Sequence, residues 1–385
     1  MPRSSSFVIH EAYCVWQGEI VWRVLLEPRC LHTSKKADTT DRENYVHCEG
    51  TIGRIKYKKL RVKKGKCFDG LIDIYKEFFR NDDKKNNKKW IFRGQKRKRT
   101  KEGDIDCSHC DKTSCEKDNV AFLASLQKAF SKFMIAGPGE TQEEAKQKWE
   151  KDVIRAFKRK AHHYESNIPD KVDILEWLAL IQHYFGPTRL LDWVYSYFIA
   201  CYFAMNELDC KEEIAEVWAI DANWLTYNKE RKVERIAEII GNGNYSVLNT
   251  TAGWQAEVEH IDRNCALSNG VIHFLMREPS ACVYNVTPFR LNERLINQQG
   301  TFLLQGDITQ CFIRNLEATL RDNLTSSSEH LMRVVISLDG IEAKKQVLRD
   351  LDRMGINQAM LFPDLRGFAE SLIRRLAFPE KRNPK

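Results

Sequence analysis

The sequence lacks an apolar run long enough to cross a bilayer. Its longest aromatic-rich run, Trp193 to Met205, has 13 residues, whereas a membrane-spanning helix needs about 20. No apolar segment typical of a signal peptide follows Met1 to Phe7. We therefore expect a cytoplasmic protein without a membrane partner, in which the aromatic run forms a buried helix.

The 12 cysteines lack the regular spacing of a secreted disulfide scaffold. Most have apolar neighbours, as Cys201 and Cys282 do, which favours free, buried thiols. Cys107 and Cys110 form one Cys-x-x-Cys pair, and Cys115 follows. A structural zinc ion usually takes four ligands from two such pairs. Because only one pair is present, a surface loop with free thiols is favoured over a zinc site.

An ordinary composition excludes a wholly disordered chain. Of the 385 residues, 43% are hydrophobic and 30% are charged, which permits a core without disulfides. Aromatic and β-branched runs at 13–16, 20–26 and 53–60 predict a small β-rich extension over residues 1–66. Residues 67–385 would form the main domain, with a charged, cysteine-bearing insertion at about 95–118.

The main domain mixes helical and strand patterns, which predicts an α+β fold. Apolar spacing predicts helices over 68–79, 173–184 and 195–208. Strands are predicted at 90–92, 188–193, 216–220, 302–304, 333–336 and 360–362. The charged run 140–151 is expected to interrupt the helices between residues 119 and 165.

Positive charge is concentrated in one segment. Residues 54–101 contain 20 Lys and Arg and 5 Asp and Glu, a net of +15, although the whole chain carries only +8. Such a segment favours a nucleic acid or another acidic partner nearby, with a solvated surface as the alternative. A dense basic run, Lys96, Arg97, Lys98 and Arg99, is the candidate nucleic-acid contact.

Four separated blocks carry candidate chemistry. They are Phe92-Arg93-Gly94-Gln95, the segment from Gln182 to Trp193 (QHYFGPTRLLDW), Asn297 to Phe302 (NQQGTF) and Leu361 to Phe368 (LFPDLRGF). An Arg at the end of a strand can hold a phosphate or carboxylate, and a following Gly permits close backbone approach. In the second block, Arg189 and Asp192 can form a structural pair or share a ligand, and spacing alone favours the pair.

Together these blocks resemble the FRG domain family, named for its Phe/Tyr-Arg-Gly motif. Its second signature, His-Tyr-Gly-x-Pro-Thr-Arg-Leu-Leu-Asp-Trp, matches 183–193 closely, and the resemblance extends from about residue 68 to 376. Phe185 stands where the family usually has Gly, Gly186 stands at its variable position, and Arg366 replaces an acidic residue.

The resemblance implies a function as well as a fold. FRG proteins are mostly bacterial or phage-encoded, and several lie in toxin–antitoxin or phage-defence contexts. Their Arg-Gly strand looks like the first core strand of ADP-ribosyltransferases, which cleave NAD. The family would therefore transfer ADP-ribose from NAD to a macromolecule, here favouring RNA or DNA, and could act with an antitoxin or inhibitory partner.

The same resemblance assigns site residues. The implied NAD-binding set is Arg93, Gly94, Gln95, His183, Tyr184 and Arg189, and the implied catalytic set is Arg93, Thr188, Asp192 and Gln299. Glu257 and Glu259, in an alternating segment, compete with Gln299 for the third catalytic element. Because the Gln299 block has no clear Glu, a non-catalytic nucleotide-binding or nucleic-acid-binding module and an NAD glycohydrolase stay open as alternatives.

Overall fold

The computed structural model describes most of the chain. The described residues are 15–16, 19–20, 44–52, 54–63, 65–80, 88–98, 125–133, 137, 139–211, 213–225, 271–320, 324–336 and 338–377. The chain divides into two units, Met1–Arg42 and Glu43–Lys385. In the first unit, β1 (Val15–Trp16) and β2 (Glu19–Ile20) form an antiparallel pair.

The second unit contains an eight-stranded sheet in the order β3-β4-β10-β7-β5-β6-β9-β8. Only the β4–β10 pair is parallel among these strands. The strands are β3 (Tyr45–Ile52), β4 (Ile55–Val62), β5 (Trp90–Lys98), β6 (Leu190–Val194), β7 (Glu213–Asp221), β8 (Val283–Val286), β9 (Gly300–Gln305) and β10 (Leu331–Ile336). Helices surround this mostly antiparallel sheet, so the predicted α+β class is confirmed.

The boundary expected at residue 66 lies elsewhere. β3 and β4 form a hairpin whose second strand pairs with β10 over Lys58–Arg61. Residues 45–62 therefore belong to the main sheet, and the division between units falls between Arg42 and Glu43. A local strand pattern cannot reveal a pairing with residues some 270 positions later, which is why the sequence placed the boundary too late.

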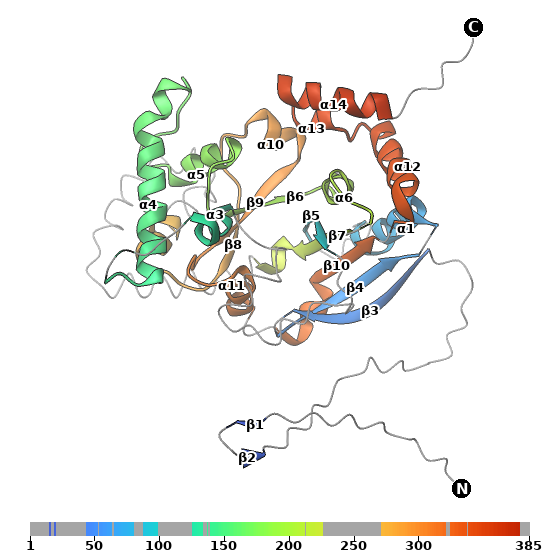
Figure 1. Ribbon diagram of the computed structural model, residues 1–385, viewed down its shortest axis with the longest axis horizontal. Coiled ribbons are helices and arrows are strands. Elements are labelled where there is room, and N and C mark those ends of the chain that lie inside the picture. The colour runs from blue at the N-terminus through green and yellow to red at the C-terminus, as the bar shows by residue number, and fades with distance from the viewer. Residues whose placement is uncertain are drawn as a thin grey trace. The chain divides into compact units, whose positions relative to one another are not determined.

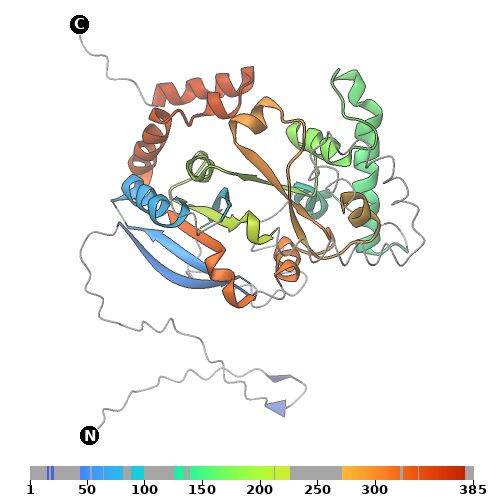
Figure 2. The ribbon, with the colours of Figure 1, turned by 180° about the vertical axis from the view of Figure 1, so that it is seen from behind.

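Two groups of helices cover the sheet at opposite ends (Figures 1 and 2). At one end lie α1 (Cys67–Ile74), its π-helical continuation (Tyr75–Phe79) and α12 (Gly340–Arg353). At the other end lie α3 (Ser125–Phe133), α4 (Gln142–Lys160) and α5 (Ile174–His183). The remaining helices are α6 (Tyr197–Met205), α10 (Glu293–Asn297), α11 (Phe312–Thr319), α13 (Gln358–Leu361) and α14 (Leu365–Ala377), with short 3-10 turns at Ala161–His163 and Leu324–Glu329.

Helix α6 is the buried aromatic helix that the sequence predicts. Seven of its nine residues are buried, and it packs on β5 within the largest core cluster. Its Cys201 thiol is fully buried and is not part of a disulfide, and the same holds for the disulfide state of the buried Cys282 just before β8. In the described part of the chain, no helix has the length and apolar character to span a membrane.

Two expected elements are wrong. The charged run 140–151 does not interrupt a helix but lies largely within α4, which begins at a capping box formed by Thr141 and Glu144. The strand expected at 360–362 is instead the end of helix α13. Asn357 caps this short helix through the Met360 N–H, a local hydrogen bond that outweighs the strand preference of the apolar run.

Gly94 permits the contact between α6 and β5. A Cβ added there would lie 1.8 Å from the carbonyl oxygen of Ala200 and 2.8 Å from the backbone nitrogen of Ala204. We expect Gly94→Ala to lower the free energy of unfolding by about 1–3 kcal/mol through overpacking. Urea unfolding measures this change.

Gly137→Ala is the matched control. Its Cβ would meet only a Glu140 oxygen at 3.3 Å, so we expect a change within about 0.5 kcal/mol. Equal effects of the two substitutions would contradict the packing role of Gly94.

Candidate functional site

The sheet opens between β5 and β6. Their pairing is recorded at one position, Phe92 with Val194, although β6 continues to pair with β9 over its whole length. Gly94 and Asp192 would be partners if the β5–β6 ladder continued. The opening leaves backbone groups of both strands to be satisfied by side chains or by a ligand.

Arg93 lies across this opening. Its Nη1 donates to the backbone oxygen of Asp192 at 2.6 Å, while its buried Nε has no hydrogen-bond partner. Burial lowers the pKa of the guanidinium, and the Asp192 carboxylate partly offsets this effect. An unpaired buried donor of this kind is costly to the folded state.

A cavity of about 210 Å³ adjoins the opening. Two of its lining residues, Asp192 of β6 and Phe302 of β9, are direct partners in the sheet. Its described lining comprises Ser125, Ala179, Gln182, His183, Phe185, Gly186, Asp192, Asn292, Arg294, Leu295, Gln298 and Phe302. Among the described lining residues, Asp192 has the one acidic side chain.

A chain of hydrogen bonds orients that carboxylate. The Thr188 hydroxyl donates to Gln182 Oε1 at 2.5 Å, and the Ser125 hydroxyl approaches the same oxygen at 3.2 Å. Gln182 Nε2 then donates to Asp192 Oδ2 at 3.0 Å. Since both hydroxyls fix the oxygen side of the amide, its NH₂ group faces the carboxylate. Thr188 is fully buried and acts on the site only through Gln182.

Cations surround Asp192. The pKa of Lys128 is lowered by burial and by Arg93 and raised by Asp192, and that of Arg294 is lowered by burial and raised by Asp192 and Asp364. These mutual effects place the three positive groups within electrostatic reach of one carboxylate. Among the described groups named here, including Asp364, three are cations and two are carboxylates, a combination that suits an anionic ligand.

His183 lines the cavity as a neutral imidazole. Burial, followed by the charge of Arg294, lowers its pKa below the ordinary 6.5, and its buried Nδ1 has no hydrogen-bond partner. Tyr184 lies outside the cavity lining, where its hydroxyl donates to Glu165 Oε2 at 3.0 Å.

Helix α5 ends at the cavity in an unusual way. The N–H of Gly186 donates to the Ile181 oxygen and that of Phe185 to the Gln182 oxygen, at 2.8 and 3.0 Å, which is the Schellman pattern. This pattern requires a left-handed residue, normally Gly, and here Phe185 has φ 60°. A left-handed conformation costs a residue with a Cβ roughly 1–2 kcal/mol. Phe185 thus adopts, with a bulky side chain, a backbone conformation that usually requires Gly.

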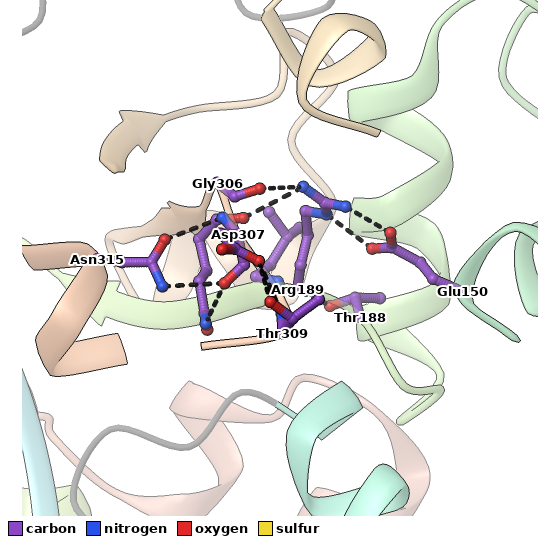
Figure 3. A network of polar contacts seen from close by, with 9 residues as sticks. Glu150, Thr188, Arg189, Gly306, Asp307, Thr309 and Asn315 are labelled. Atoms are coloured by element: carbon purple, nitrogen blue, oxygen red, sulfur yellow. Dashed lines mark hydrogen bonds and ion pairs between the residues drawn. The ribbon is translucent and has the colours of Figure 1, made fainter. Parts of the chain in front are cut away.

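Arg189 belongs to a buried structural pair and not to the cavity, contrary to the prediction of NAD binding. Its Nε and Nη2 donate to the Glu150 carboxylate of α4 at 2.7 and 2.5 Å. Its Nη1 donates to the backbone oxygens of Gln305 and Gly306 (Figure 3). Only 2% of Arg189 is exposed, so the pair anchors β6 to α4 and to the end of β9.

Gln299 does not line the cavity, whereas its neighbour Gln298 does. Gln299 is exposed and left-handed, with φ 49°, and its backbone oxygen accepts from the Tyr195 N–H at 2.8 Å. Its position in the turn before β9 therefore places the predicted third catalytic element outside the described cavity lining. The competing Glu257 and Glu259 lie outside the described residues.

The other predicted residues are divided between the sheet and undescribed segments. Gly94 faces α6, and Gln95 pairs with Glu216 of β7 on the side of β5 away from β6. Lys96 is exposed and donates to the Glu207 backbone oxygen at 2.8 Å. Arg97 and Lys98 complete β5, while Arg99 and the proposed zinc ligands Cys107, Cys110 and Cys115 lie outside the described residues. Within the described ranges, no cluster of metal-binding side chains occurs.

Comparison with known families identifies part of this arrangement. Residues 88–213 match the FRG domain. Neither the curated proteins nor the solved structures contain a match to the chain. The matched segment spans β5, α5, β6 and α6, including Arg93, Gln182 and Asp192. It ends before α10 and β9, which complete the cavity.

Several residues of the cavity lining have no recognised signal in the sequence. Gln182 is the first residue of the second block, but the sequence predicts no catalytic or binding role for it. Its contacts with Ser125 and Asp192 depend on the fold. Arg294 precedes the third block, and Phe302 is the last residue of that block. Ser125 has no sequence signal, since its place is fixed by α3 packing beside Thr188.

The buried pair of the FRG domain predicts a strong effect on stability. Arg189→Met should lower the free energy of unfolding by about 3–5 kcal/mol, because it leaves the Glu150 carboxylate buried and unpaired. The double variant Arg189→Met/Glu150→Leu should recover much of the loss. Urea unfolding compares them with the exposed control Arg353→Ala, and a loss under about 1 kcal/mol for Arg189→Met would contradict the structural role.

His183 predicts a pH dependence. Because its pKa is lower in the folded state, the unfolded chain binds the proton more readily as the pH falls below about 6.5. The stabilising contribution is therefore complete at neutral pH and is lost as the pH falls through the folded pKa. His183→Gln should flatten the unfolding free energy between about pH 7 and 5, and an NMR titration midpoint of His183 above 6.5 would refute the assignment.

Proposed function

We propose that this FRG protein cleaves NAD and transfers ADP-ribose to a macromolecule, with nucleic acid as the favoured acceptor class. The observation that carries the proposal is the single cavity carboxylate, Asp192, oriented by Gln182 and faced by Arg93, Lys128 and Arg294. This combination suits a substrate that carries phosphate and develops positive charge at a sugar carbon.

The cavity is too small to enclose a whole dinucleotide. Its volume of about 210 Å³ is below the roughly 300–1,000 Å³ of pockets that enclose whole small molecules. One half of a dinucleotide would enter the cavity, and the remainder would extend over its rim. In this arrangement the cations near Asp192 neutralise the pyrophosphate.

The chemistry assigns a role to each charge. Breaking the bond between nicotinamide nitrogen and ribose carbon leaves the electron pair on nicotinamide and positive charge on the ribose. The ionised Asp192 stabilises that charge, and Arg93 holds the strand opening in position while offering its unpaired Nε to a phosphate oxygen. An acceptor hydroxyl or amine then forms the new bond to the ribose carbon and loses a proton to water.

The basic segment supports nucleic acid as the acceptor. Residues 54–101 carry a net charge of +15 and include β5, the strand that holds Arg93. A surface of this kind binds polyanions in a salt-dependent way. A toxin or defence effector, restrained by an inhibitory partner, is the biological role that the FRG resemblance favours.

Removing the carboxylate tests the proposal. Asp192→Asn retains the shape and the backbone oxygen that binds Arg93, so NAD affinity should change by less than about threefold. Nicotinamide release should fall by about 10²–10³-fold, the usual effect of removing one charge-stabilising group. The measurement uses ³²P-labelled NAD with separate RNA, DNA and protein pools, and chromatography of nicotinamide.

Arg93→Ala and Arg353→Ala complete the design. Arg93→Ala should weaken NAD binding, whereas Arg353, exposed on α12 beside Asp350, should be dispensable. Nicotinamide release without labelled acceptor would indicate NAD hydrolysis. Binding of nucleotides or RNA by the folded wild type, without nicotinamide release or labelling, would replace the proposal with the binding-module alternative.

A further inference from the structure

Phe185 keeps a strained backbone where the same chain elsewhere uses glycine. Helix α12 ends with the same two hydrogen bonds as α5, from Gly355 to Asp352 and from Ile356 to Leu351, at 2.8 and 2.9 Å. Its left-handed residue is Gly355, with φ 79°. Phe185 performs the same backbone role with a bulky side chain. A strained, non-glycine residue beside a cavity indicates a function for its side chain.

That side chain is an exposed aromatic surface at the cavity rim. Phe185 is 69% exposed although it lines the cavity. The Arg294 guanidinium lies 4.9 Å from its ring centre and 4.8 Å from that of Phe362, so it is held between two rings. The Arg366 guanidinium lies 5.8 Å from the Phe185 ring. The ring is thus oriented by cations, while most of its surface faces solvent.

We propose that Phe185 stacks the adenine base of a nucleotide bound in this cavity. The inference rests on the nucleotide-binding part of the proposed function and names its base subsite. Aromatic side chains stack bases with little regard to hydrogen-bonding edges, and Arg294 links this platform to the charges around Asp192. A base on Phe185 would therefore place its phosphates near those cations.

The positive charge beside Phe185 favours adenine over the nicotinamide ring at this position. Arg294 places a positive charge against the Phe185 ring, whereas Arg366 is ion-paired with Glu370. The nicotinamide ring of NAD is itself a cation. Adenine is neutral and avoids this repulsion. The adenine half of NAD would consequently occupy the rim, which leaves the nicotinamide ribose for the interior beside Asp192.

The variant Phe185→Gly distinguishes an effect on the stability of the fold from an effect on nucleotide binding. Phe185→Gly recreates the helix end found at Gly355, so the thermal midpoint should stay unchanged or rise. Calorimetric affinity for AMP should fall about 5- to 100-fold, the range expected for loss of one stacked base. Affinities for ribose 5-phosphate and nicotinamide mononucleotide should change by less than twofold, and Phe185→Tyr should retain AMP binding.

Four results would overturn the proposal. They are AMP affinity within twofold of wild type in Phe185→Gly, an equal loss for ribose 5-phosphate, a larger loss for nicotinamide mononucleotide, and a wild type that binds AMP no better than ribose 5-phosphate. Gln299→Gly relieves the other left-handed side chain, outside the cavity lining, and should leave AMP binding unchanged. Because AMP cannot be cleaved to nicotinamide, the result is independent of whether the chain turns NAD over.

Discussion

The separation of β6 from β5 is the constraint on which the candidate site depends. The two strands meet at Phe92 and Val194, and β6 then follows β9. A continued ladder would satisfy the Asp192 backbone oxygen with a backbone donor, but here the Arg93 guanidinium supplies the hydrogen bond. Arg93 of the first motif therefore contacts Asp192 of the second motif across a gap in the sheet. Gly94, which follows Arg93, serves the opposite face by admitting α6.

A residue with a left-handed backbone conformation precedes each of the two strands, β6 and β9, that contribute to the cavity lining. Phe185 precedes β6 and Gln299 precedes β9, and they are the two non-glycine residues with positive φ in the described chain. Both follow helix ends whose hydrogen bonds require the left-handed conformation. The paired strands hold these turns in place, so strain at each helix end is offset by the ladder that follows it. Only Phe185 also presents its side chain to the cavity.

Local patterns predicted the α+β class, the buried helix α6 and the α5–β6 block, because each depends on apolar spacing within a short segment. Contacts between distant segments were not predictable. Arg189 could equally have bound a ligand until Glu150, 39 residues earlier, was seen to pair with it. Likewise, the left-handed turn at Gln299 moves the lining position to Gln298, a shift that residue identity alone does not encode.

Two groups of charged residues, one at Arg189 just before β6 and one at Asp192 within β6, differ in burial and in charge balance. The Arg189–Glu150 pair has one charge of each sign, is almost fully buried and leaves few donors unused, as a structural ion pair must. Three residues later, Asp192 is exposed and lies within electrostatic reach of three described cations. Solvent tolerates this imbalance, whereas a protein interior would not. In the function that we propose, these cations bind the phosphates of NAD and the Asp192 carboxylate stabilises the positive charge that develops on its ribose.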